Sequence, residues 1–308
     1  MRILIAGLGT QGKKRKIVAD IECVATVDPM NPDADYQSIY DIPTDRYDTV
    51  FICVPEEEKI ELIRYAVKYG KHVLVEKPLL SPNFHAIKEI ESESRKAGVT
   101  IYSAYNHRFE PHIEAVANLI ESGRLGNIYS CRLFYGNGTA TLVRNSTWRD
   151  KGKGVLSDLG PHLLDIVRFW FGDIRAPFKL ISCNRFENKA PDHAILLSEA
   201  NMPRIELEMT LVSWKNHFTC DLFGEYGSVH IRSLCKWGPA KLTVHWRVFP
   251  GGPPKEEIET LTQEDPTWEK EHQHFKSLCI KNHKTDLSSD LWILQTINRS
   301  SNGGTSAC

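Results

Sequence analysis

Two short motifs contain the residues of this chain that are best suited to chemistry. The first is the glycine loop GLGTQG at residues 7–12, directly after a short apolar segment. The second is Glu76-Lys77-Pro78, at the end of the hydrophobic run HVLVE. A glycine loop between a strand and a helix offers backbone amides to a pyrophosphate, and a lysine at a strand end can exchange a proton with a substrate. In this order the two motifs predict a dinucleotide-dependent redox enzyme.

The glycine loop also indicates which dinucleotide binds. Asp28 follows the next apolar segment, at the spacing of about 20 residues that is typical of the acidic residue bonding the adenine ribose. Because a carboxylate there repels a 2′-phosphate, the sequence predicts NAD rather than NADP. The predicted cofactor residues of this region are Gly7, Gly9, Thr10, Gln11, Gly12 and Asp28.

A basic run, residues 13–16, follows the loop at the start of the expected helix. The helix dipole disfavours cations in a first turn. The run is either a solvated helix face or an attractor of phosphates that also allows NADP to bind. We favour the solvated face.

Hydride removal from a secondary alcohol requires that the hydroxyl proton leave as well, so the site needs a base whose pKa is near the working pH. Lysine is normally too basic, but desolvation and the positive charge of an oxidised nicotinamide both lower its pKa. Lys77 follows a buried strand, where ligands gather in parallel sheets. We therefore predict that Lys77 is catalytic; a solvated surface charge is the alternative.

A second candidate lies in GVLSDLGPHLLD, residues 154–165. Proline is tolerated near a helix start, so we expect a helix from Asp158, with Asp158 as its amino-terminal cap. His162 then lies one turn in, where the dipole favours the neutral imidazole, and Asp165 could orient the ring. The alternative is a capping aspartate and a histidine that packs on a sheet. Whether Lys77 or His162 takes the proton stays open.

The polar loop 136–154 is a candidate substrate contact. Trp148 beside Arg149 suits a sugar face together with a hydroxyl, carboxylate or phosphate, although an ordinary surface loop is equally compatible. His107 and Arg108 could also reach the cleft in which the substrate would bind. Alternatively, Arg108 could connect the two domains.

The elements that must position these residues alternate along the first 104 residues. Apolar strands are expected at 2–6, 23–27, 47–54, 71–76 and 100–103, with helices after the glycine loop and at 55–68 and 82–97. Strands that are apolar throughout and alternate with helices predict a doubly wound parallel sheet of the Rossmann type.

After residue 104 the pattern changes. Helices are expected at 111–122, 158–171, 266–281 and 287–299, with strands at 128–135 and repeatedly between 178 and 249. Consecutive strands joined by short turns predict an α+β domain with an open, antiparallel or mixed sheet. We therefore predict a dinucleotide-binding domain at 1–104, a substrate domain at 105–299 and a disordered tail at 300–308.

Composition excludes several classes of protein. The 308 residues carry a net charge of −1, so no overall field favours nucleic acid or an anionic membrane. No apolar run approaches the roughly 20 residues of a membrane helix, and the start of the chain does not resemble a signal peptide. The eight cysteines form no CxxC pair or metal-ligand spacing. We expect reduced thiols, no metal and a cytosolic location.

With these residues assembled, the chain resembles the glucose–fructose oxidoreductase / inositol dehydrogenase (Gfo/Idh/MocA) family over residues 1 to 299. The likeness rests on GLGTQG, KYGKHVLVEKPL, AYNHRF at 104–109, GVLSDLGPHLLD and FGEYGSVHI at 223–231. The resemblance implies an NAD(P)-dependent oxidoreductase of sugars, sugar nucleotides or cyclitols. It also implies a homo-oligomer, a dimer or tetramer, that forms through the open sheet.

The resemblance assigns roles residue by residue. Lys77 would be the catalytic lysine beside the nicotinamide, and Glu76 would bond the nicotinamide ribose. His162 would be the second acid/base residue, with Asp158 as a substrate contact or as its partner. Asn106 would lie near the nicotinamide and the substrate, and Val54 and Pro55 stand where the family has a cofactor contact. Trp148 and Arg149 are predicted as substrate contacts from their chemistry and not from the resemblance.

Three departures from the family pattern are visible. The chain has Val54-Pro55 and then Lys59, where the family commonly has threonine-proline and a histidine. Few residues separate Asp28 from Asp48, so a helix and a strand of the first domain are expected to be abbreviated. The glycine run before His162 is interrupted by Lys153.

Two other functions fit parts of the pattern. A redox-assisted lyase or hydrolase would oxidise a sugar transiently and retain its NAD without net release of NADH. A nucleotide-sensing regulator would not need Lys77 and His162 together, so their joint presence disfavours it.

Overall fold

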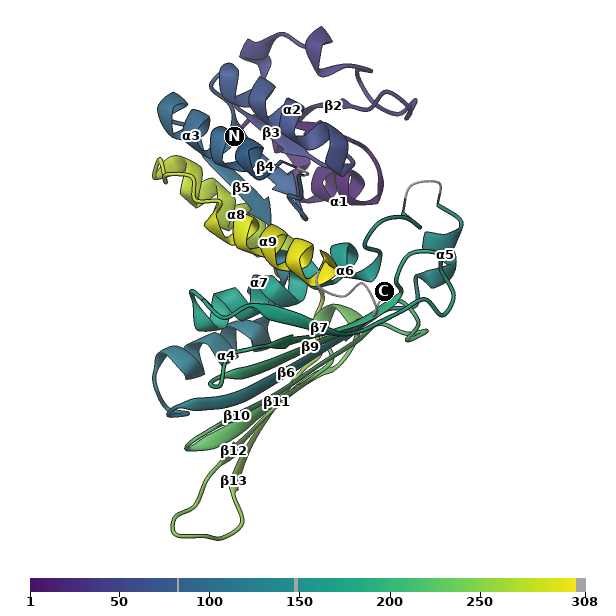
Figure 1. Ribbon diagram of the computed structural model, residues 1–308. Coiled ribbons are helices and arrows are strands. Elements are labelled where there is room, and N and C mark those ends of the chain that lie inside the picture. The colour runs from purple at the N-terminus through teal and green to yellow at the C-terminus, as the bar shows by residue number, and fades with distance from the viewer. Residues whose placement is uncertain (82, 147–148, 303–308) are drawn as a thin grey trace. The chain divides into compact units, whose positions relative to one another are not determined.

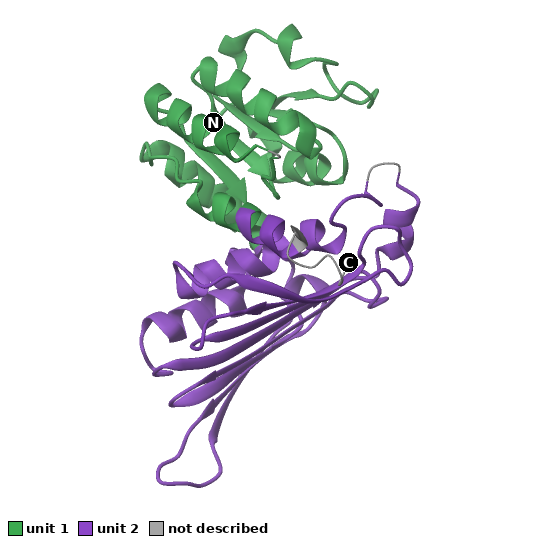
Figure 2. Ribbon diagram, viewed as in Figure 1, with its two compact units in different colours: residues 1–106, 267–294 green, residues 107–266, 295–308 purple. Residues whose placement is uncertain are grey.

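The computed structural model describes residues 1–81, 83–146 and 149–302 (Figure 1). The chain divides into two compact units, coloured separately in Figure 2. Unit 1 comprises Met1–Asn106 and Thr267–Leu294, and unit 2 comprises His107–Pro266 and Gln295–Cys308. We predicted from the sequence that segment 267–294 belongs to the second domain, whereas in the structure this segment packs with unit 1.

Unit 1 is built on a parallel sheet of five strands in the order β2-β1-β3-β4-β5. This confirms the predicted Rossmann-type sheet. The strands are β1 (Ile3–Ala6), β2 (Cys23–Val27), β3 (Thr49–Ile52), β4 (His72–Glu76) and β5 (Ile101–Ala104). The helices that connect them are α1 (Thr10–Ala19), α2 (Glu56–Lys68) and α3 (Phe84–Ala97).

Alternate side chains of these strands enter two different cores. Leu4, Val50 and Val73 pack with residues of α2 and α3 on one face. Ile3, Phe51 and Leu74 pack on the other face with Ala19 of α1 and with Phe275 and Cys279 of α8 (Thr267–Ile280). Because each face of a parallel sheet needs a helical cover, α8 belongs to unit 1 despite its distance along the chain.

The connection from β2 to β3 is short, as the spacing of Asp28 and Asp48 predicted. Residues 28–48, all of them described, contain two 3-10 turns, Ile39–Asp41 and Thr44–Arg46, in place of a helix and a strand. As a result β2 is an edge strand of the sheet.

Unit 2 is built on an eight-stranded sheet in the order β13-β12-β11-β10-β6-β9-β8-β7. Neighbouring strands are antiparallel except for the parallel pair β6 and β9, so the sheet is mixed, as expected. The strands are β6 (Ile128–Gly136), β7 (Phe178–Asn184), β8 (His193–Ser198), β9 (Arg204–Thr210), β10 (His217–Gly224), β11 (Gly227–Arg232), β12 (Ala240–Trp246) and β13 (Lys255–Leu261).

The two faces of this sheet differ in chemistry. On β10, Phe218, Cys220 and Leu222 are fully buried, whereas Asp221 and Phe223 point to the opposite side. The buried side is covered by α4 (Pro111–Glu121), α6 (Val155–Asp158) and α7 (Gly160–Phe171), as Figure 1 shows. The opposite side, here called the outer face, includes Arg132, Glu206, Asp221, Phe223, Ser228, His230, Arg232 and His245.

Two short or terminal helices complete the described chain, α5 (Ala140–Arg144) and α9 (Ser288–Asn302). Residues 300–302 of the tail that was expected to be disordered belong to α9, and residues 303–308 lie outside the described part. No described helix is long and apolar enough to span a membrane. Within the same residues, no group of three or more His, Cys, Asp or Glu side chains could hold a metal ion.

Most of the cysteines described are free thiols, namely Cys23, Cys53, Cys131, Cys220, Cys235 and Cys279. Cys183 on β7 is disulfide-bonded, so the prediction of reduced thiols is wrong at that position. The predicted cytosolic location stays a prediction.

Candidate active site

The candidate cofactor residues of unit 1 follow the carboxyl ends of all five strands. Residues 7–12 come after β1, Asp28 after β2, Val54-Pro55 after β3, Lys77 after β4 and Asn106 after β5. Parallel strands place their carboxyl ends at one edge of the sheet, which is where such sheets bind ligands. The topology therefore brings these sequence-predicted residues to one edge.

The glycine loop is closely packed on one side and open on the other. A side chain at Gly12 would lie 1.8 Å from the carbonyl oxygen of Gly7, and Gly7 itself has a φ of +92° and lies against Cys53. A side chain at Gly9, by contrast, would meet nothing within 4 Å. Thr10 and Gln11 begin α1 and are exposed. Bare backbone at a helix amino terminus fits the pyrophosphate of a dinucleotide.

Asp28 supports the loop from β2. One oxygen of its carboxylate accepts a hydrogen bond from the amide of Leu8 at 2.7 Å, and the other accepts from the amides of Met30 and Asn31 at 2.9 Å each. Burial alone would raise the pKa of Asp28, but the three amides outweigh it and lower the pKa. The group is therefore a stable anion. Its bond to an adenine ribose stays a prediction.

Arg15 is not part of a solvated helix face, so that interpretation of the run 13–16 is wrong at this residue. Arg15 is 1% exposed. Its guanidinium donates to Glu76 at 2.7 Å and to Glu271 of α8 at 2.6 Å, and it lies over the ring of Trp268. The expectation failed because α8 supplies a carboxylate from a distant part of the sequence. Lys13, Lys14 and Lys16 are exposed, as expected.

Glu76 and Asn106 both have partners within unit 1. Glu76 is 7% exposed and accepts the hydrogen bond from Arg15, and the side-chain amide of Asn106 donates to the hydroxyl of Thr267 at 2.8 Å. The predicted contacts of these two residues with a nicotinamide stay predictions. Both bonds tie strand ends of the sheet to α1 or to the start of α8.

The candidate catalytic residue of unit 2, His162, lies in an aromatic and basic cluster. The rings of His162 and His107 stack with centroids 4.1 Å apart, and Tyr135 lies 5.8 Å from His162. The amine of Lys236 lies 2.7 Å from Nε2 of His107. Burial, with the charge of Asp158, raises the pKa of Tyr135, so its hydroxyl keeps its proton.

Sequence reasoning named His107 but missed Tyr135 and Lys236. Tyr135 is 7% exposed and faces the buried side of β6. The alternation of the predicted strand could have placed Tyr135 on the buried side. A buried tyrosine hydroxyl usually has a polar partner, so Tyr135 could have been recognised as a candidate site residue. Lys236 lies in a short 3-10 turn, Cys235–Trp237, which carries no comparable pattern.

Asp158 is not the amino-terminal cap of the helix that carries His162, so that prediction is wrong. Asp158 is the last residue of α6, and α7 begins at Gly160 after a break at Leu159, with Pro161 in its first turn. The Asp158 carboxylate instead accepts from Arg149 at 2.9 Å, with each side chain about a third exposed. The structure thus brings two predicted substrate residues together. Trp148 lies outside the described residues.

We expected that Asp165 could orient the ring of His162, but it bonds another residue. It is fully buried, and its two oxygens accept from the guanidinium of Arg108, at 2.8 Å for the Nε bond. Burial raises the pKa of Asp165, with Arg108 acting in the opposite direction. The pair joins the 3-10 turn Asn106–Phe109 to α7.

Two models of known protein families match the chain. Residues 1–105 match the model of an oxidoreductase family with an NAD-binding Rossmann fold, and residues 113–230 match the Gfo/Idh/MocA C-terminal domain. The chain belongs to the Gfo/Idh/MocA family of oxidoreductases. Its first domain is accordingly an NAD-binding Rossmann domain.

Curated relatives of this Gfo/Idh/MocA protein include named dehydrogenases. Trans-1,2-dihydrobenzene-1,2-diol dehydrogenase of Oryctolagus cuniculus is 28% identical over 177 residues, which are 57% of this chain and 53% of the relative. Levoglucosan dehydrogenase of Pseudarthrobacter phenanthrenivorans is 28% identical over 157 residues, 49% of this chain and 40% of the relative. The matches thus span about half the length of these relatives or less.

Solved structures share the fold over nearly the whole chain. Levoglucosan dehydrogenase in complex with NADH superposes with a TM-score of 0.82 at 17% identity, covering 98% of this chain and 97% of that one. An oxidoreductase from Agrobacterium radiobacter in complex with NAD+, L-tartaric acid and magnesium gives a TM-score of 0.80 at 17% identity, covering 100% and 97%. At this identity the likeness establishes the fold.

Proposed function

We propose that this protein transfers a hydride between NAD and a secondary alcohol or ketone of a sugar, a sugar derivative or a cyclitol. The observation that supports the proposal most is the set of strand ends in unit 1, where the glycine loop, Asp28 and Lys77 share one edge. The names of the curated relatives, which include a levoglucosan dehydrogenase and a dihydrodiol dehydrogenase, support the substrate class.

In this proposal the edge of the sheet in unit 1 binds the cofactor. Residues 7–12 hold the pyrophosphate on backbone amides, and Asp28 accepts hydrogen bonds from the adenine ribose. Val54, Pro55, Glu76 and Asn106 contact the nicotinamide half. The bound NAD supplies the carbon that accepts the hydride.

Side chains of this protein transfer the hydroxyl proton. As the carbon–hydrogen bond of the alcohol breaks and its electron pair leaves with the hydrogen, the oxygen–hydrogen bond also breaks and its proton passes to the amine of Lys77. In the reverse direction the Lys77 ammonium returns that proton to the ketone oxygen. His162 is the second acid/base group. Asp158, Arg149 and Trp148 contact the substrate, because a carboxylate, a guanidinium and an indole suit hydroxyl groups and a sugar face.

A screen for NADH fluorescence tests the proposal. The purified protein is mixed with NAD or NADP and with free sugars, sugar phosphates, nucleotide sugars or inositols in turn. We expect one class to produce NADH, with NAD preferred over NADP. Tightly retained NAD without net NADH from any compound would favour the redox-assisted lyase or hydrolase, and failure to bind NAD or NADP would reject the proposal.

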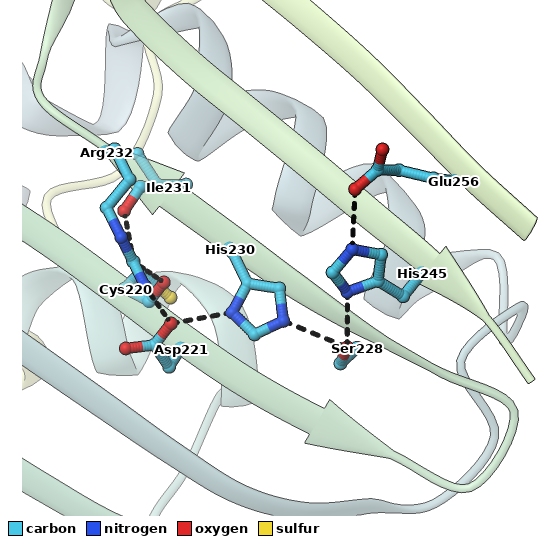
Figure 3. Close-up of polar contacts among 8 residues, drawn as sticks. All are labelled: Cys220, Asp221, Ser228, His230, Ile231, Arg232, His245 and Glu256. Carbon is cyan, nitrogen blue, oxygen red and sulfur yellow. Dashed lines mark hydrogen bonds and ion pairs between the residues drawn. The ribbon is translucent and has the colours of Figure 1, made fainter. Parts of the chain in front are cut away.

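We infer further that two copies associate through the outer face of the open sheet. Figure 3 shows its polar centre, where Nδ1 of His230 lies 2.6 Å from Asp221 and Nε2 lies 3.0 Å from the hydroxyl of Ser228. Phe223, 45% exposed, lies beside His230. A two-fold interface sets one patch against itself, and charges of both signs around exposed aromatic rings suit such an interface.

A further inference from the structure

The turn that carries Lys77 is held by a buried lysine of the neighbouring helix. Lys59, in the first turn of α2, is only 2% exposed. Its ammonium donates to the carbonyl oxygen of Glu76 at 2.7 Å, to that of Pro78 at 2.7 Å and to the carboxylate of Glu56. Two of these three hydrogen bonds therefore hold the backbone directly before and directly after Lys77.

Glu56 adds a further bond to the same turn. Its second carboxylate oxygen accepts from the amide of Leu80 at 2.9 Å. Burial raises the pKa of Glu56, while Lys59, the Leu80 amide and the charge of Lys77 act in the opposite direction. The amine of Lys77 is thus within electrostatic reach of Glu56. The ion pair of Glu56 and Lys59 is called the α2 clamp below.

Other charged groups of unit 1 surround the same strand end. Arg15 of α1 bonds Glu76 of β4, and Glu271 of α8 bonds Arg15 in turn. The thiol of Cys53, after β3, lies among these charges, and burial and Glu76 raise its pKa against the effects of Arg15 and Lys59. The strand end is therefore fixed by Arg15 at the Glu76 carboxylate and by the α2 clamp at the backbone.

A buried ammonium is costly unless each of its donors has a partner. Lys59 satisfies that condition, because its three donors meet two carbonyls and one carboxylate. Packing alone does not require such a group, since a hydrophobic side chain would fill the space without the cost of desolvating a charge. All of its backbone bonds go to the turn of Lys77, and rigid support of that kind is what a functional side chain needs.

We propose that Glu56 and Lys59 are positioning residues for Lys77: the α2 clamp fixes the backbone turn that carries this lysine and balances the charge around its amine. The inference rests on the proposed function, because it assigns the clamp to the same reaction. Removal of Lys59 leaves the negative charge of Glu56 unbalanced near Lys77, and removal of the Glu56 charge leaves the positive charge of Lys59 unbalanced. The two changes should shift the protonation of Lys77 in opposite directions.

The test measures the amine of Lys77 directly, so it needs no substrate. The full-length protein is acetylated with trace acetic anhydride at a series of pH values, and the peptide containing residue 77 is quantified by mass spectrometry. We expect Lys59→Met to raise the midpoint of the labelling curve by about 0.5–1 pH unit and Glu56→Gln to lower it by a similar amount. The double variant should return to within about 0.2 unit of the parent.

Lys68→Met is the matched control, because Lys68 is exposed near the end of the same helix. Its labelling curve should coincide with that of the parent. NADH fluorescence titration of every variant reports whether the cofactor domain is folded, and the affinities should agree within about threefold. With a sugar that the parent oxidises, Lys59→Met should lower kcat by about 10–100-fold and leave KM nearly unchanged.

Opposite shifts at normal NADH affinity support the clamp. Midpoints that shift in the same direction in both variants, or that do not shift, overturn the proposed clamp. If Lys59→Met does not fold, the isosteric Glu56→Gln variant still decides, because an unchanged midpoint in that variant also overturns the clamp. An inactive Lys77→Ala variant would leave the proposed function standing in that case. If Lys77→Ala retains full turnover, the role proposed for Lys77 fails, whatever the labelling shows.

Discussion

Single charged residues of unit 1 are held by specific partners, and those partners were only partly visible in the sequence. The motif GLGTQG and the strand before Glu76 were enough to predict the roles of the glycines and to single out Lys77. The burial of Arg15 could not be predicted, because its second carboxylate, Glu271, comes from a helix far along the chain. For the same reason Asp165 was paired with its neighbour His162 rather than with Arg108. Local spacing predicts a residue's type of chemistry better than its partner.

Replacement of Lys77 tests the proposed proton acceptor. Lys77→Ala should lower kcat at least 100-fold, because no amine then takes the hydroxyl proton. The affinity for NADH should change less than about threefold, since in the proposed function the glycine loop and Asp28 provide the binding. Steady-state kinetics and fluorescence titration measure the two quantities, and Lys71→Ala, directly before β4, is the control. Full activity would refute the role.

Replacement of Asp28 tests cofactor selectivity. Asp28→Asn keeps the size of the side chain but removes the charge that would repel a 2′-phosphate. The ratio of kcat/KM for NAD to that for NADP should fall about tenfold or more. Asp33→Asn removes an equal charge from an exposed position nearby and should leave the ratio unchanged. A parent protein that prefers NADP would contradict the argument from Asp28.

Apolar patterns in the sequence predicted the helices and strands that pack against other elements. The five buried strands of unit 1 and most strands of unit 2 were predicted from those patterns, whereas β13 was missed. Its residues KEEIETL are exposed along almost the whole strand, so no apolar alternation marks it. The docking of α8 on unit 1 was also missed, because an amphipathic helix does not indicate which sheet it will cover.

Glu22 joins α8 to the rest of unit 1, and its charge should make stability depend on pH. Burial alone would raise its pKa, but hydrogen bonds from Lys276, His272 and the N-terminal amine outweigh it and bring the pKa to about 2. Because the folded pKa lies below the ordinary value of 4.5, this stabilisation is complete above about pH 4.5 and is lost as the pH falls toward 2.

Glu22→Gln should therefore lower the free energy of unfolding at pH 7 by roughly 1–3 kcal/mol and weaken its decline in acid. Urea unfolding at pH 7 and at pH 3 measures both effects. Glu93→Gln alters a surface carboxylate of α3, 3.9 Å from Arg64, and should cost less than about 0.5 kcal/mol. If the two variants have the same acid dependence, Glu22 does not hold α8 in this way.

At the scale of the whole molecule, the association of two copies has a direct test. Phe223→Lys places a charge on the outer face of the sheet and should weaken self-association at least tenfold. Sedimentation velocity over a range of concentrations measures it. Ile280→Lys makes the same kind of change at the exposed end of α8 and should leave association unchanged. A parent that stays monomeric at all concentrations would reject the proposed interface.

The charged strand β13 limits how such a sheet can grow. An eight-stranded sheet with free edges could in principle add strands from other copies through backbone hydrogen bonds. At the β13 edge, however, a second β13 would set two strands side by side that each carry Glu256, Glu257 and Glu259. Lateral polymerisation at that edge is thus disfavoured, while stacking of faces is not. The same molecule can therefore form a closed pair through its outer face while its β13 edge resists the addition of further copies at high concentration.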